Sequence, residues 1–211
     1  MSELKKFEKE LDYQLSNLAK SEKKRKISAL RKELDKYNEK FLNKHIEELF
    51  NLGFKNQREI ALIGMLVYLW EYEARYHFLV NILCFVLTIN GEKIVVNQKT
   101  RKTINCNSFS EVEKVGIHNK IEFLKENGFK IMELNDNNLR NDIAHYNFLI
   151  DEDGTVKFYK SNGKLVKEVI HKRHEDMLDL LSEVFPSFWN YLKEYDIYPY
   201  DTPLPPQDFS P

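Results

Sequence analysis

An arginine and a histidine stand five positions apart in the segment Leu139–Phe148, LRNDIAHYNF. The guanidinium of Arg140 is permanently charged and forked, which suits it to binding a phosphate. The imidazole of His145 can take or give a proton near neutral pH, so it can act as a general base or acid. Together they form a minimal set for cleaving a phosphodiester without a metal, if the nucleophile is the 2′-hydroxyl of RNA.

The spacing of these residues restricts their geometry. In a helix, Asn141 and His145 share one face, so the amide can orient the imidazole. Arg140 and His145 lie roughly 140° apart around a helix of 3.6 residues per turn, so one straight helix aims them in different directions. They converge on one phosphate if the helix distorts or ends near Ala144, or if two copies face each other across a two-fold axis. We favour the two-fold arrangement.

The six residues Arg140 to His145, RNDIAH, resemble the R-x4–6-H signature of HEPN domains, with the Asn that commonly follows the Arg. The resemblance covers about residues 58–195. It implies an all-α domain that usually dimerises. Many members of this superfamily are metal-independent ribonucleases of toxin, antiphage defence or RNA-processing systems.

This resemblance implies an endoribonuclease that needs neither metal nor cofactor. His145 would act as general base or acid, Arg140 would stabilise the charge of the transition state, and Asn141 would hold the imidazole or contact phosphate. The partners would be RNA, a second copy of the chain and an antitoxin or regulatory protein. Toxins of the family often carry a modified Tyr two positions after the His; here Asn147 stands there and the tyrosine is Tyr146.

An alternative is a non-catalytic HEPN-like module that binds RNA, a nucleotide or a protein through the same groove, because a fold does not define an activity. In a purely structural interpretation, Arg140 and His145 cap helix carbonyls.

The stretch Ile60 to Ile89 is hydrophobic almost all round, which predicts a central, buried helix beginning near Asn56. Glu71 and Arg75 interrupt it four positions apart. Buried charges must be paired or used. The two side chains therefore either pair with each other or line the cleft beside Arg140 and His145.

Residues 1–57 are predicted to form an N-terminal helical arm, because apolar residues recur at coiled-coil intervals from Leu4 to Phe41. Such an arm would pack on a partner. Residues 1–58 carry 15 Lys and Arg against 10 acidic residues. The basic run at Lys23–Lys26 is either a solvated helix face or a contact for RNA phosphates.

Turn signals divide the remainder of the HEPN-like domain, residues 58–195. Asn90–Gly91 precedes a predicted β-hairpin, and Lys99 and Arg101 make this insert a plain surface hairpin or an RNA-contact loop. Period-two patterns after His145 predict a second hairpin around residues 151–154, extended past Gly163.

Three further signals complete the expected helices. A third helix is predicted from a capping box at Ser108 or Ser110 to Gly128. Pro186 is expected to kink or restart the last helix. Residues 196–211 form a Pro-rich tail. The predicted fold is thus mainly α: an antiparallel helical bundle with small β-hairpin inserts and an N-terminal coiled-coil-like extension.

The composition excludes several classes of protein. The 211 residues carry a formal net charge of −1, which argues against a general nucleic-acid coating protein. Two cysteines do not make a disulfide framework, and Cys84 is expected in the core. The N-terminus is unlike a signal peptide, and uncharged runs are shorter than the ~18–20 residues that span a bilayer. We therefore expect a soluble, cytoplasmic protein without a membrane partner.

Overall fold

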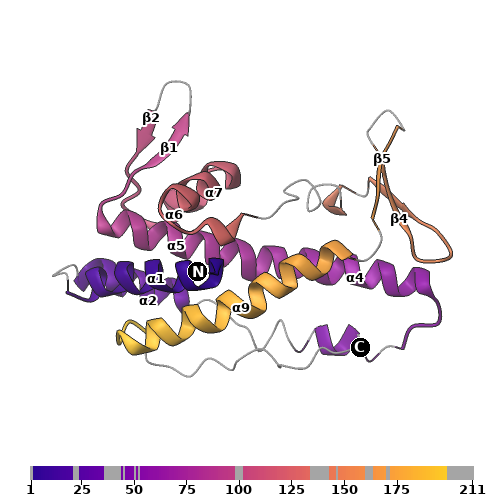
Figure 1. Ribbon diagram of the computed structural model, residues 1–211, viewed down its shortest axis with the longest axis horizontal. Coiled ribbons are helices and arrows are strands. Elements are labelled where there is room, and N and C mark those ends of the chain that lie inside the picture. Colours follow the sequence, from indigo (N-terminus) through magenta and orange to yellow (C-terminus); the bar gives the residue numbers. More distant parts are fainter. Residues whose placement is uncertain are drawn as a thin grey trace. The chain divides into compact units, whose positions relative to one another are not determined.

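The structure is a computed structural model. It describes residues 2–20, 24–35, 44, 46–49, 51, 53–97, 102–133, 143–145, 147–159, 164–169 and 172–198. The described chain is mainly helical with two small antiparallel sheets, which confirms the predicted class (Figure 1). The residues fall into two compact units: unit 1 comprises residues 1–39, 77–133 and 182–211, and unit 2 comprises residues 40–76 and 134–181. This grouping differs from the boundaries at residues 57 and 195 drawn from the sequence.

Unit 1 is built around helix α5 (His77–Asn90), which is buried on all sides from Leu79 to Ile89. Helices α1 (Glu3–Lys20) and α2 (Lys24–Leu34) both contact it. Most described residues of the apolar stripe predicted in the N-terminal region are buried: Phe7, Leu11, Leu15, Leu18, Leu30 and Leu34 are all 0% exposed, whereas Leu4 and Ile27 are half-buried. The N-terminal helices therefore form part of the core of unit 1, where the sequence had suggested an arm on a partner.

The third predicted helix is two helices, α6 (Phe109–Glu113) and α7 (Ile117–Glu126), followed by a 3-10 turn η2 (Lys130–Met132). Gly116 stands between them with an extended ψ of 140°, which interrupts the helical backbone. The predicted start at Ser108 and the end before Gly128 are confirmed. Ser108 makes no side-chain cap bond, but the Glu111 carboxylate accepts a hydrogen bond from the Asn107 amide at 2.6 Å.

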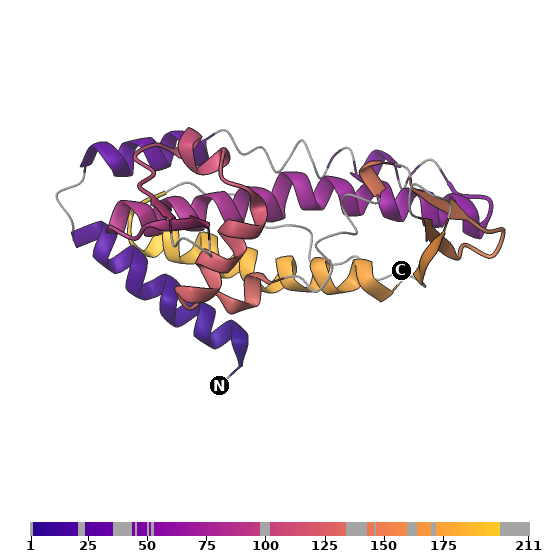
Figure 2. The same ribbon diagram turned by 90° about the horizontal axis from the view of Figure 1, so that it is seen from above.

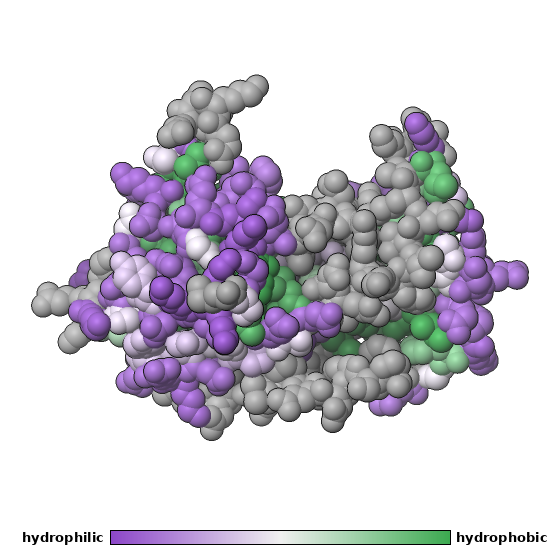
Figure 3. Space-filling view, in the orientation of Figure 1, coloured by the Kyte–Doolittle hydropathy of each residue, from purple (hydrophilic) through white to green (hydrophobic). Residues whose placement is uncertain are grey.

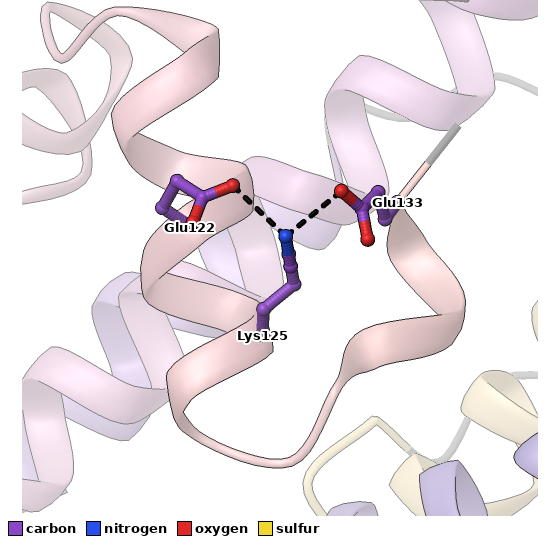
Figure 4. A network of polar contacts seen from close by, with 3 residues as sticks. All are labelled: Glu122, Lys125 and Glu133. Atoms are coloured by element: carbon purple, nitrogen blue, oxygen red, sulfur yellow. Dashed lines mark hydrogen bonds and ion pairs between the residues drawn. The ribbon is translucent and has the colours of Figure 1, made fainter. Parts of the chain in front are cut away.

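Gly128 closes α7 in a conformation that favours glycine, with φ +89°. A Cβ at this position would lie 3.1 Å from Cγ of Glu10, so the turn also approaches α1 closely. Beside it, the Lys125 ammonium bonds Glu122 at 3.1 Å and Glu133 at 2.8 Å, which links α7 to the residue that follows η2 (Figure 4).

The remaining elements of unit 1 are a hairpin and the end of the last helix. Strands β1 (Ile94–Asn97) and β2 (Lys102–Ile104) pair antiparallel, which confirms the first predicted hairpin. Helix α9 (Lys172–Glu194) continues through Pro186, so the predicted restart is wrong. A proline removes one backbone donor but leaves the rest of a long helix intact when packing holds it.

Within unit 1, the ribbon of α9 runs beside α1 (Figure 2), and side chains of α1 and α2 bond to α9 and to the residues just after it. Ser187 Oγ donates a hydrogen bond to Glu8 at 3.0 Å, and the Tyr195 hydroxyl donates one to Asp12. Arg31 of α2 donates to the backbone carbonyl of Ile197 at 2.6 Å and so ties α2 to the chain just after α9.

Unit 2 contains helix α4 (Gln57–Glu71), a π-helical turn η1 (Tyr72–Tyr76) and a three-stranded sheet. The helix begins where the sequence predicted, and Asn56 is its N-cap: the side-chain Oδ1 of Asn56 accepts a hydrogen bond from the backbone amide of Glu59 at 3.0 Å. The sheet order is β3 (Phe148–Ile150), β4 (Val156–Tyr159) and β5 (Leu165–Val169), which confirms the second predicted hairpin and its extension.

The turn between β3 and β4 lies against the start of α4. Gly154 has φ +85°, and a Cβ there would lie 3.0 Å from the backbone oxygen of Gln57. The turn of the sheet therefore packs against the first turn of α4, and β3 is the strand that contacts this helix.

Among the described residues, one lysine is buried in the interior of unit 1. Lys120 of α7 is 0% exposed, and its ammonium lies 2.6 Å from Asn81 Oδ1 and 3.4 Å from His77 Nε2, both on α5. Among the described residues no carboxylate lies within ion-pair distance. Burial lowers the pKa of Lys120, and the nearby Cys84 and Glu113 oppose this effect. Cys84 is a buried free thiol, as expected, and burial raises its pKa.

In the described part of the chain, no helix combines the length and the apolar character needed to cross a bilayer.

The lowered pKa of Lys120 predicts how stability varies with pH. Between the lowered pKa and the ordinary value near 10.4, the unfolded chain holds a proton that the folded chain has released, so the folded state gains stability as pH rises. Relative to Lys120→Met, the wild-type protein should therefore gain free energy of unfolding as the pH rises above the lowered pKa toward about pH 10, measured by urea unfolding. Each pH unit between the two pKa values corresponds to about 1.4 kcal/mol.

Lys125→Met is the control. Its ammonium is partly exposed, and its hydrogen bonds to Glu133 and Glu122 raise its pKa, so the stability that it adds is lost as pH rises through the raised value. A difference between wild type and Lys120→Met that stays constant over this range would show that the ammonium is not buried.

Candidate functional site

Of the residues that the sequence nominated, His145, Glu71 and Arg75 are described, and all three belong to unit 2. Five others lie outside the described residues: Arg140, Asn141, Tyr146, Lys99 and Arg101. The site is therefore described from His145 and from the side chains that unit 2 brings together.

His145 follows a helical turn that includes Ile143 and Ala144, and β3 begins at Phe148. The helical turn thus ends at Ala144. An end near Ala144 is one of the arrangements that would allow Arg140 and His145 to point toward one phosphate. Ile143 is 3% exposed, whereas His145 is exposed. A buried isoleucine anchors the turn, and the imidazole two residues later is accessible to a substrate.

Glu71 and Arg75 pair with each other, as the first sequence alternative expected. Arg75 Nη1 donates to Glu71 Oε1 at 2.9 Å, and the two residues are 3% and 8% exposed. Glu71 is the last residue of α4, and Arg75 lies in the π-helical turn. Single π-helical turns inside α-helices are frequent at functional sites, so this ion pair is a candidate for positioning the residues of such a site.

The environment of Glu71 opposes its ionisation. Burial raises the pKa of its carboxyl, and the charge and hydrogen bond of Arg75 counteract that shift. The second carboxylate oxygen, Oε2, is buried and accepts no hydrogen bond from the described residues. The carboxylate thus depends on Arg75 for its stability in the interior and retains the capacity to accept one more bond.

A cavity of about 460 Å³ lies between the start of α4 and β3. It is lined by Asn56, Arg58, Glu59, Leu62, Phe148, Leu149 and Ile150. Neither Arg58 nor Phe148 was predicted from the sequence as a site residue. Two sequence signals could have indicated them: a basic residue in the first turn of an otherwise apolar helix, and an aromatic residue three positions after His145.

No cluster of three or more His, Cys, Asp or Glu side chains in the described ranges is placed to hold a metal ion. No protein family model, no curated protein and no solved structure matches the chain.

Removing Arg75 should be costly, because it leaves a carboxylate buried without its cation. Arg75→Met is expected to lower the free energy of unfolding by about 3–5 kcal/mol at pH 7, whereas the double variant Glu71→Met/Arg75→Met should be neutral or more stable. Urea unfolding of the three proteins measures both effects.

The loss in Arg75→Met should shrink as pH falls toward 5, because a carboxyl with a raised pKa takes up a proton in the folded state before it does in the unfolded chain. Equal losses in the single and double variants would show that the pair is not a buried, interdependent unit.

Proposed function

We propose that this protein is a metal-independent endoribonuclease of the HEPN type, acting in a toxin, antiphage or RNA-processing system. The observation that carries the proposal is His145, exposed at the end of a helical turn whose Ile143 is buried, within the sequence RNDIAH. An anchored backbone with an accessible imidazole meets the first requirement of general acid–base catalysis, which is a positioned group that reaches the substrate.

In the proposed reaction, the 2′-oxygen of a ribose attacks the adjacent phosphorus as one imidazole of His145 takes the 2′-hydroxyl proton. The bond from phosphorus to the 5′-oxygen breaks, and that oxygen receives a proton. The products are a 2′,3′-cyclic phosphate and a 5′-hydroxyl. Arg140 neutralises the negative charge that builds on the phosphate oxygens.

Two protomers would supply one Arg140–His145 pair each, so that one imidazole takes the first proton and its counterpart gives the second. The Glu71–Arg75 pair belongs to the same compact unit as this segment. We assign it a positioning role, because this buried ion pair joins the end of α4 to the π-helical turn that follows it.

The test is cleavage of a labelled single-stranded RNA in excess EDTA. Wild type should cleave it, and His145→Ala and Arg140→Ala should each lose about 10²- to 10⁴-fold in rate. His118→Ala is the matched control, because it removes a histidine from α7 in unit 1 and should cleave at the wild-type rate. A 2′-O-methyl RNA should resist cleavage by all of them.

Two results would contradict the proposal: cleavage that requires a divalent metal, or His145→Ala with wild-type activity. Binding of RNA without any cleavage would instead support the binding module. The two-fold site also predicts a dimer at micromolar concentration in sedimentation equilibrium, and a strict monomer would remove it.

A further inference from the structure

The cavity between α4 and β3 has a size and lining that the proposed reaction does not use. Its volume of about 460 Å³ falls within the range of about 300–1,000 Å³ typical of small-ligand sites. All of its lining residues belong to unit 2, which also contains His145. The cavity is therefore part of the same compact unit as the candidate catalytic histidine.

One wall of the cavity is apolar. Phe148, Leu62 and Ile150 contribute to it, and Leu149 adds an edge that is 61% exposed. Leu62 is 42% exposed although it stands on a helix of the core. Figure 3 shows hydrophobic side chains reaching the surface over the three-stranded sheet. Leu62 and Leu149 are therefore apolar side chains of this wall that remain exposed to solvent.

The other wall is polar, and its side chains differ in whether they already form hydrogen bonds. The Glu59 carboxylate accepts hydrogen bonds from the Lys55 amide at 2.8 Å and from the Asn56 side-chain amide at 3.2 Å. Asn56 Oδ1 is occupied by the Glu59 amide. Of the three polar side chains, only Arg58 has no hydrogen bond or ion pair with the described residues. The Glu59 carboxylate keeps its negative charge but is already bonded to these two amides, so the polar group of this wall that is left to bind a phosphate is the guanidinium of Arg58.

An aromatic ring beside a guanidinium is the combination that single-stranded nucleic-acid sites use, since the ring stacks on a base and the cation contacts the phosphate. Phe148 follows His145 by three residues, a length of chain that spans at most about 11 Å when extended. A nucleotide in the cavity would therefore lie close to a phosphate held at His145.

We propose that this cavity binds one unpaired nucleotide of the RNA substrate, next to the phosphate that is cleaved. Phe148 stacks on the base, with Leu62 and Ile150 completing the apolar wall, and Arg58 contacts the phosphate of that nucleotide. The assignment rests on the proposed ribonuclease function and extends it, because it names the residues that select an unstacked, single-stranded substrate.

Binding can be measured apart from cleavage with a fluorescent, single-stranded 2′-O-methyl RNA 12-mer, in which no 2′-hydroxyl can attack. Phe148→Leu should weaken its binding about tenfold or more, whereas Phe148→Tyr, which keeps the ring, should bind as wild type does. An abasic strand with the same phosphates should bind Phe148→Leu and wild type equally, because it offers no base to stack.

Arg58→Gln should weaken binding of both strands and reduce the slope of log affinity against log salt by about 1. Lys55→Gln is the matched control, because it removes an exposed cation three residues away that does not line the cavity. Thermal unfolding of each variant verifies that the fold is retained.

The outcomes separate the two proposals. Wild-type cleavage with unchanged KM and unchanged RNA affinity in both Phe148→Leu and Arg58→Gln overturns the nucleotide site and leaves the ribonuclease intact. Absence of cleavage together with the predicted affinity losses supports the nucleotide site and favours the binding module. Equal losses for the intact and abasic strands in Phe148→Leu would overturn base stacking.

Discussion

The hydrophobic run from Ile60 to Ile89 carries polar and charged side chains into the protein interior, and each of them has to be satisfied there. In unit 2, Arg75 satisfies Glu71 across one π-helical turn. In unit 1, Asn81 and His77 receive the ammonium of Lys120 from a neighbouring helix. The contact between Lys120 and Asn81 joins two helices and restricts which faces of α7 and α5 can meet, because a shifted helix would leave the ammonium without a partner in an apolar core.

In the proposed ribonuclease, different side chains of unit 2 would support the backbone and carry the chemistry. Its buried groups, the Glu71–Arg75 pair and Ile143, hold the backbone, whereas the groups offered to a ligand, His145 and Arg58, stand at the surface. The sheet connects His145 with Arg58, since β3 begins three residues after His145 and contacts α4, which carries Arg58. A phosphate site and a base site on the two ends of this short stretch would suit a single-stranded RNA.

Local signals in the sequence were sufficient for most elements. The apolar stripe of α1, the start of α4 near Asn56 and both hairpins were predicted because each depends on residues near one another in the chain. The break at Gly116 was missed, and of the two alternatives for Pro186, a kink or a restart, the restart was wrong. Both depend on how strongly the surrounding core holds a weak backbone position, which local propensity does not contain.

By itself the sequence determined that Glu71 and Arg75 would be neighbours, since four positions on a helix place two side chains on one face. It also predicted a phosphate-binding guanidinium at Arg140 and a proton-transferring imidazole at His145. Only the tertiary structure decided that the N-terminal stripe faces α5, that Lys120 is buried against Asn81, and that Arg58 and Phe148 line one cavity. Periodicity defines which face of an element is apolar, but the choice of the face it meets depends on contacts between residues far apart in the chain.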